Sequence, residues 1–391
     1  MIRNEGLRRR PILAKVKPAV LRWARETAGV DEGAAARRAG VSVTDLERWE
    51  EGYALPSLRE LQELAGFYAR SLATLLLPEP PAAVPEPVDF RTMGRERPLP
   101  LGRETRISLR TAGHLQQVAS ELSSSAFPTR TVALQADPES LAASERRALG
   151  VTVEAQASWP DVYSGLRAWR TAVESRGALV FQLPLPIREV RGFSLSGKNP
   201  PVIVVSSSDG PAPRSFTLFH EYAHLLLGSS GVCLPDVAPR VEGMRLSEER
   251  FCNEFAGALL VPAAALAELA QTSHVLQDDR TPPDDELELL ARHFRVSRQV
   301  LLYRALAADL VSEAAFREKW TEWQALPAPL RRSGGGGRTS ARRAFDQLGS
   351  EFVGLVMRAR DNGRLSTSDA LECLSIQSRH WSQLETLAGL R

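Results

Sequence analysis

The chain has 391 residues, of which 43% are hydrophobic and 25% charged, and its formal net charge is +2. This length suggests two or three domains, the composition is that of a soluble globular protein, and the balanced charge points to no single class of partner. Three scattered cysteines exclude a disulfide framework, and no apolar run approaches the ~20 residues of a membrane helix. We therefore expect a cytoplasmic protein with no membrane contact.

Residues 1–80 predict a small all-helical domain. The spacing of apolar residues indicates helices at 18–27, 32–39 and 43–51, and further helical turns between 58 and 77. Gly40 marks the turn before the third helix, and Ser42 can cap that helix. A helix, a turn containing glycine and a second helix form the helix-turn-helix arrangement.

Three strings in this region resemble the XRE (Cro/C1-type) helix-turn-helix family over residues 17–78: Ala39-Gly40-Val41-Ser42, Arg48-Trp49-Glu50-Glu51-Gly52 and Pro56-Ser57. The resemblance implies DNA binding through the third helix, with Ser42, Thr44 and Arg48 as candidate contacts. That helix also carries four acids, which repel the phosphate backbone: Asp45, Glu47, Glu50 and Glu51. The alternative is a module that docks a protein or the catalytic part of this chain.

A proline-rich run at 78–87 favours extended backbone, and we place a linker at 81–100 and a second domain at 101–330. Helical patterns at 103–122 and 162–175 precede three β-branched or apolar runs at 177–184, 190–195 and 201–205. These runs predict short strands. Helices around a small sheet predict a mostly helical α+β fold, with the sheet packed on the helix that follows.

That following helix contains the motif His-Glu-x-x-His within residues 215–228. His220 and His224 lie one turn apart on one helix face, so both imidazoles can bind one Zn²⁺. Glu221 then lies beside the metal, where it can act as general base on a water molecule. We expect the strand at Val202–Val205 to form the sheet edge nearest the metal, where an extended peptide can pair with it.

A catalytic zinc ion takes three protein ligands and keeps one position open. The predicted helix at 247–260 offers three carboxylates for the third position: Glu248, Glu249 and Glu254. Glu249 is favoured because Asn253 lies four residues later on the same face. There, one of the two can bind the metal while the other orients a ligand histidine.

Two strings resemble the ImmA/IrrE family of zinc metallopeptidases: Phe216-Thr217-x-x-His220-Glu221-x-x-His224 and Glu249-x-x-Cys252-Asn253-x-Phe255-Ala256-x-x-Leu259-Leu260-x-Pro262. The resemblance implies a zincin-like domain in which His220, His224 and Glu249 bind the metal and Glu221 is the general base. It also implies that the protein substrate is a transcriptional repressor whose cleavage switches on stress, defence or mobile-element genes. Mn²⁺ or Fe²⁺ can also occupy such a ligand set.

The end of the chain predicts a flexible Gly/Arg linker at 331–343 and a helical module at 344–391. Its pattern indicates no function and no oligomeric state. Two functions compete for the whole chain. One is a metallo-endopeptidase, and the other is a DNA-binding transcription regulator whose metal site senses rather than cleaves.

Overall fold

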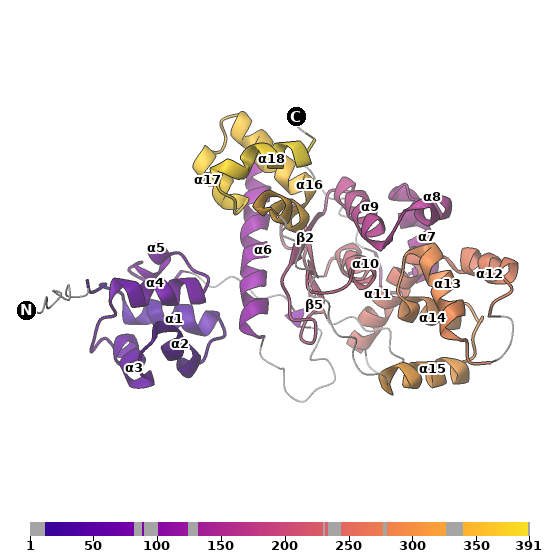
Figure 1. Cartoon of the computed structure of the whole chain (residues 1–391), viewed down its shortest axis with the longest axis horizontal. Coiled ribbons are helices and arrows are strands. Elements are labelled where there is room, and N and C mark those ends of the chain that lie inside the picture. The colour runs from indigo at the N-terminus through magenta and orange to yellow at the C-terminus, as the bar shows by residue number, and fades with distance from the viewer. Residues whose placement is uncertain are drawn as a thin grey trace, which may run out of the picture. The chain divides into compact units, whose positions relative to one another are not determined.

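The computed structural model describes residues 12–81, 88–89, 101–123, 132–229, 231–233, 244–276, 280–325 and 339–389 (Figure 1). The chain divides into two compact units. The first unit comprises Met1–Glu86 and Leu99–Arg110, and the second comprises Pro87–Pro98 and Thr111–Arg391. The two units are therefore interleaved along the chain.

The first unit contains the predicted helices: α1 (Pro18–Thr27), α2 (Glu32–Ala39), α3 (Val43–Glu51), α4 (Leu58–Phe67) and α5 (Leu72–Leu75). Gly40 ends α2 in the left-handed conformation, with a φ of 74°, which a glycine adopts without strain. The last two helices are separate because Ala69 is also left-handed, with a φ of 49°, and interrupts the helical path. Ser71 then caps the short α5.

A buried ion pair ties α1 to α3 in this unit. Nε of Arg25 donates to one carboxylate oxygen of Glu50 at 2.8 Å, and a second guanidinium nitrogen donates to the other at 2.9 Å. Around this pair, Leu21, Leu46 and Leu61 are fully buried. The apolar faces of four short helices thus close over one bidentate charge pair.

The sheet of the second unit has five strands: β1 (Val88–Asp89), β2 (Leu179–Leu183), β3 (Gly192–Leu195), β4 (Val202–Ser206) and β5 (Gly231–Cys233). Their spatial order is β1-β5-β3-β4-β2. Strand β4 is parallel to β2 and antiparallel to β3, while β5 is antiparallel to β3 and parallel to β1. The three predicted strands are β2, β3 and β4.

The expectation that Val202–Val205 forms the sheet edge nearest the metal is wrong. Strand β4 lies between β3 and β2, and all five of its residues are buried. Continuous burial explains its run of β-branched residues, because both faces of the strand are covered.

Helices cover both faces of the sheet. Val180, Ile203 and Val205 belong to the core shared with α10 (Pro211–Leu227), which packs on β3 and β4. Phe181 lies on the other face, where its ring meets Phe352 of α16 (Ser340–Asp361) edge to face at 5.4 Å. Figure 1 shows the strands between α16 and α10.

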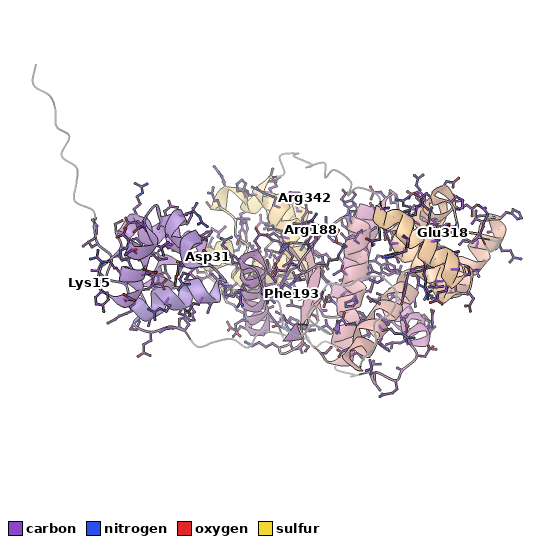
Figure 2. All side chains as sticks on the ribbon, turned by 90° about the horizontal axis from the view of Figure 1, so that it is seen from below. Lys15, Asp31, Arg188, Phe193, Glu318 and Arg342 are labelled. Atoms are coloured by element: carbon purple, nitrogen blue, oxygen red, sulfur yellow. The ribbon has the colours of Figure 1, made fainter. Side chains whose placement is uncertain are left out.

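Phe193, labelled in Figure 2, lies in the same row across the sheet as Phe181, since both residues are paired with Val204. Neighbours in register project to one face, so Phe193 also points away from α10. Its ring is fully buried. The adjacent β3 residues Gly192 and Ser194 therefore face α10.

The remaining described helices surround this centre: α6 (Arg103–Leu122), α7 (Pro138–Ala148), α8 (Val153–Ser158), α9 (Val162–Ser175), α11 (Met244–Leu260), α12 (Ala263–Thr272), α13 (Asp284–Phe294), α14 (Arg298–Ala307), α15 (Glu313–Ala325), α17 (Thr367–Cys373) and α18 (Trp381–Leu387). Among the described residues no single helix is long and apolar enough to cross a membrane, whereas the bent pair of α11 and α12 meets those criteria when taken together.

The C-terminal helices form a layer of the second unit. Helix α16 is broken at Gly349, whose φ is 82° and ψ 162°. At this break the guanidinium of Arg170 in α9 donates to the carbonyl of Asp346 at 2.7 Å, and Gln182 of β2 donates to the same oxygen at 2.9 Å. The buried pair of Arg170 and Glu174 thereby holds the kinked helix against the sheet.

Candidate metal centre

Helix α10 carries the histidine motif through the middle of the second unit. Pro211 begins it at a position where a missing N–H costs nothing, and Gly228 ends it in the left-handed conformation with a φ of 72°. His220, Glu221 and His224 are all fully buried. Burial of three ionisable groups on one helix is costly unless they are paired or bind a metal.

Helix α11 packs along α10 and brings a carboxylate to both imidazoles. Oxygens of Glu249 lie 3.4 Å from Nε2 of His220 and 3.1 Å from Nε2 of His224, and the two Nε2 atoms are 3.3 Å apart. These three residues form the group of potential metal ligands within the described part of the chain. Ligand atoms around one tetrahedral Zn²⁺ lie about 3.3 Å from each other, given metal–ligand distances of ~2.0–2.1 Å.

The outer ring nitrogens also have oxygen partners. Nδ1 of His220 lies 2.9 Å from Oδ1 of Asn253, and Nδ1 of His224 lies 3.1 Å from the Ser229 hydroxyl and 3.2 Å from Glu248. Acceptor oxygens at these positions favour a proton on each Nδ1, which leaves the Nε2 lone pairs bare. Two bare nitrogens and a carboxylate repel one another at these distances, so the donor set fits a divalent cation.

The structure separates the three candidate carboxylates. Glu249 faces the Nε2 atoms, whereas Glu248 contacts the far side of the His224 ring. Glu254 points elsewhere and pairs with Arg250 at 2.7 Å. Burial raises the pKa of Glu249, but the interactions of its carboxylate with His220 and His224 outweigh burial and hold that pKa well below its usual value.

Ser229 and Glu248 were not predicted as partners of His224. The Ser229 hydroxyl oxygen lies 2.6 Å from a carboxylate oxygen of Glu248. The hydrogen bond with His224 lowers the pKa of Glu248 most, and the hydrogen bond from Ser229 lowers it further. Gly228 is the feature of the sequence that could have indicated the position of Ser229. Because left-handed Gly228 turns the chain back, the N–H of Ser229 donates to the carbonyl of His224 at 2.9 Å.

Glu221 is the isolated carboxylate of the site. Neither of its oxygens has a well-formed hydrogen bond among the described residues. Burial raises its pKa, and the nearby histidines and the Ser194 hydroxyl only partly oppose that rise. Gly192 of β3 leaves room for it, because a β-carbon there would lie 3.1 Å from a Glu221 oxygen and 2.4 Å from Thr217. A buried carboxylate with unused acceptor capacity is suited to take a proton.

Helix α11, which carries Glu249 in its first half, is held at its C-terminal end by three buried side chains. Arg146 donates to the carbonyl of Leu259 at 2.6 Å, Gln156 to that of Leu260 at 3.0 Å, and Arg304 to that of Val261 at 2.9 Å. These carbonyls lack partners within the helix. The donors come from α7, α8 and α14, so packing from three directions fixes α11.

The predicted DNA contacts occupy different environments on α3. Thr44 and Arg48 are exposed and four residues apart, so they share one face. The Ser42 hydroxyl instead caps the helix, accepting from the N–H of Asp45 at 3.1 Å and donating to its carboxylate at 2.6 Å. Since Asp45 serves this cap and Glu50 pairs with Arg25, only Glu47 and Glu51 remain as exposed acids on the helix.

Comparison with known families identifies both parts. Residues 173–306 match the model of the peptidase M78 family, the IrrE N-terminal-like domain. Residues 19–76 match a helix-turn-helix domain. No curated protein matches the chain. The predicted fusion of a helix-turn-helix module with an IrrE N-terminal-like domain is thus confirmed, and α10 and α11 lie inside the IrrE-like match.

Proposed function

We propose that the chain is a zinc-dependent endopeptidase in which His220, His224 and Glu249 bind the metal. The observation that carries this proposal is the convergence of two Nε2 atoms and a carboxylate at 3.1–3.4 Å. Nitrogen and oxygen ligands suit Zn²⁺, and they also accept Mn²⁺ or Fe²⁺. The match to the peptidase M78 family supports hydrolysis of a peptide bond as the reaction.

When bound, the metal supplies a Lewis acid that polarises the scissile carbonyl and lowers the pKa of water. Glu221 accepts the proton of the attacking water and then donates it to the leaving amine. The raised pKa of Glu221 suits both steps. A more basic carboxylate accepts the proton more readily, and burial favours the neutral carboxylic acid that results. Asn253 fixes the ring of His220 through Nδ1.

The test uses the full chain, loaded with zinc and incubated with a candidate repressor, for which any repressor gene found next to its own gene is the first choice. We expect Glu221→Gln to keep its zinc and to cleave about 10²–10⁴-fold more slowly, since it loses the general base. Glu254→Gln serves as control, because this residue pairs with Arg250 at the surface of α11. Equal cleavage by Glu221→Gln and wild type would refute the assignment.

We propose a transcriptional repressor as substrate, whose cleavage switches on stress, defence or mobile-element genes. The helix-turn-helix match supports this, because a DNA-binding module would deliver the peptidase to proteins bound on DNA. Thr44 and Arg48 are the exposed side chains that we propose for DNA contact. The same match supports a second candidate function, a DNA-binding regulator whose metal site senses rather than cleaves.

Electrophoretic and salt-dependence measurements on promoter DNA separate these functions. If the protein locates its substrate on DNA, Arg48→Ala should weaken DNA binding and leave cleavage of free repressor unchanged. In the sensing regulator, removal of zinc by a chelator changes DNA affinity, and Glu221→Gln changes nothing. DNA binding that is absent even at low salt would refute both roles of the helix-turn-helix domain.

A further inference from the structure

Arginines gather at the C-terminal end of α4, within the first unit. Nε of Arg103 donates to the carbonyl of Phe67 at 2.8 Å, and Nη2 of Arg110 donates to that of Tyr68 at 2.6 Å. Arg70 follows directly in the turn from α4 to α5. Arg103 and Arg110 come from the first turns of α6, so two separate segments supply the positive charges.

Aromatic rings and carbonyls, rather than carboxylates, surround these arginines. The guanidinium of Arg70 lies 4.3 Å from the ring of Trp23, and that of Arg103 lies 4.5 Å from the ring of Phe67. Within the described residues, no carboxylate forms an ion pair with Arg70, Arg103 or Arg110. Burial, and repulsion from the other arginines, lower the pKa of Arg110 to about 10.

Two N–H groups in the cluster are left over after the carbonyls are satisfied. Nε of Arg70 and Nη1 of Arg110 are buried and have no acceptor among the described residues. Capping of α4 accounts for Arg103 and for Nη2 of Arg110, since cations near a helix C-terminus are favourable. It does not account for the two remaining donors, whose burial without an acceptor is costly.

We propose that Arg70, Arg103 and Arg110 form a binding site for a phosphoryl group. Guanidinium groups bind phosphate through paired N–H donors, and phosphate oxygens supply both the acceptors and the negative charge that this site lacks. The phosphoryl group belongs either to a free phosphorylated small molecule or to the DNA backbone. The site lies at the ends of α1 and α4, whereas the candidate base contacts lie on α3.

The experiment measures binding of inorganic phosphate to the full chain by calorimetry at constant ionic strength. We expect Arg70→Gln and Arg110→Gln each to weaken phosphate binding about tenfold or more, because each removes a charge-assisted hydrogen bond. Arg59→Ala is the matched control, since it removes one positive charge from the exposed surface of α4. Phosphate bound anywhere else, including the metal site, would be unaffected in all three variants.

A second arm replaces phosphate with a DNA duplex of random sequence. Loss of DNA affinity in Arg70→Gln assigns the site to the DNA backbone, and unchanged DNA affinity with lost phosphate binding assigns it to a free phosphorylated molecule. Should Arg110→Gln fail to fold, Arg70→Gln decides, because among the described residues the Arg70 side chain donates to the Thr27 hydroxyl and to no carbonyl. The proposal is overturned if Arg70→Gln binds both phosphate and DNA as Arg59→Ala does.

Discussion

Gly192 is the residue on which the position of Glu221 most directly depends. A β-carbon at this position would lie 2.4 Å from Thr217 and 2.9 Å from the carbonyl of Val204. We expect Gly192→Ala to destabilise the protein by about 1–3 kcal/mol, as overpacking does, and to slow cleavage because α10 shifts away from β3. Thermal unfolding and cleavage rates would measure both effects.

Gly197→Ala is the matched control for this substitution. It lies in the exposed turn after β3, and a β-carbon there would meet nothing within 4 Å. Unaltered stability in Gly192→Ala would mean that β3 and α10 are less closely packed than the structure shows.

The oxygens behind the two histidines that we propose as metal ligands lead to a second prediction. Removal of an outer partner of a metal ligand costs about 10–100-fold in metal affinity. We therefore expect Glu248→Ala and Asn253→Ala to bind zinc about 10–100-fold more weakly in competition with a chelator, and Glu248→Gln to recover part of the loss. Glu254→Gln should bind zinc like wild type. If Glu248→Ala lost zinc as completely as Glu249→Ala, Glu248 would be a ligand.

At this scale the sequence points to the candidate ligands more directly than to the residues that support them. The four-residue spacing of His220 and His224 is local, so helix geometry alone brings them to one face. The pairing of Glu249 with both rings required the crossing of α10 and α11, and from the residues alone three carboxylates stayed open. Ser229 and Glu248 meet at His224 from separate segments, which no local pattern records.

At the scale of a helix, the Ser42 hydroxyl has two candidate roles, capping α3 and contacting DNA. In the structure it caps α3 together with Asp45. We expect Ser42→Ala to destabilise the first unit by about 1 kcal/mol, the usual cost of a lost cap, and Thr44→Ala to leave stability unchanged. Chemical denaturation checks this, and DNA binding that falls in Thr44→Ala alone would leave Ser42 with the structural role only.

Helix α16 depends on the unusual backbone of Gly349. A β-carbon there would lie 2.3 Å from both Arg170 and Glu174, and a φ of 82° disfavours any other residue. We expect Gly349→Ala to destabilise the second unit by about 2 kcal/mol or more through strain and the disturbed ion pair. Gly354→Ala, in the same helix, would meet only the mobile end of Arg358 and should be neutral or stabilising.

Thermal unfolding compares these two variants. An unfolding temperature of Gly349→Ala equal to that of Gly354→Ala would contradict the role of the kink.

The helices were predictable from sequence where a cap and the apolar periodicity agree, as in α3. Strands β1 and β5 have two and three residues, too few to show an alternating pattern. The position of β4 was predicted wrongly because a run of β-branched residues shows burial but not neighbours. Which strands flank it depends on pairing with residues 23 positions away at β2 and 7 to 13 positions away at β3.

On the scale of the molecule, the sequence reveals its two family modules because each has its own local motif. The role of the last helices stayed unpredicted, since their amphipathic pattern says only that one face is covered. The structure shows what covers it. Phe352 and the kink at Gly349 pack on β2 and α9, so this segment completes the second unit.

The interleaving of the two units governs how the chain can be divided. A fragment that ends at residue 80 would lack Arg103 and Arg110, which hold the last carbonyls of α4. A fragment that starts at residue 101 would lack β1 and leave one side of β5 unpaired. Neither fragment therefore contains all the contacts of its own unit. When expressed separately, each should aggregate or fold incompletely. Mixing the two fragments should restore the missing contacts and improve the solubility of both.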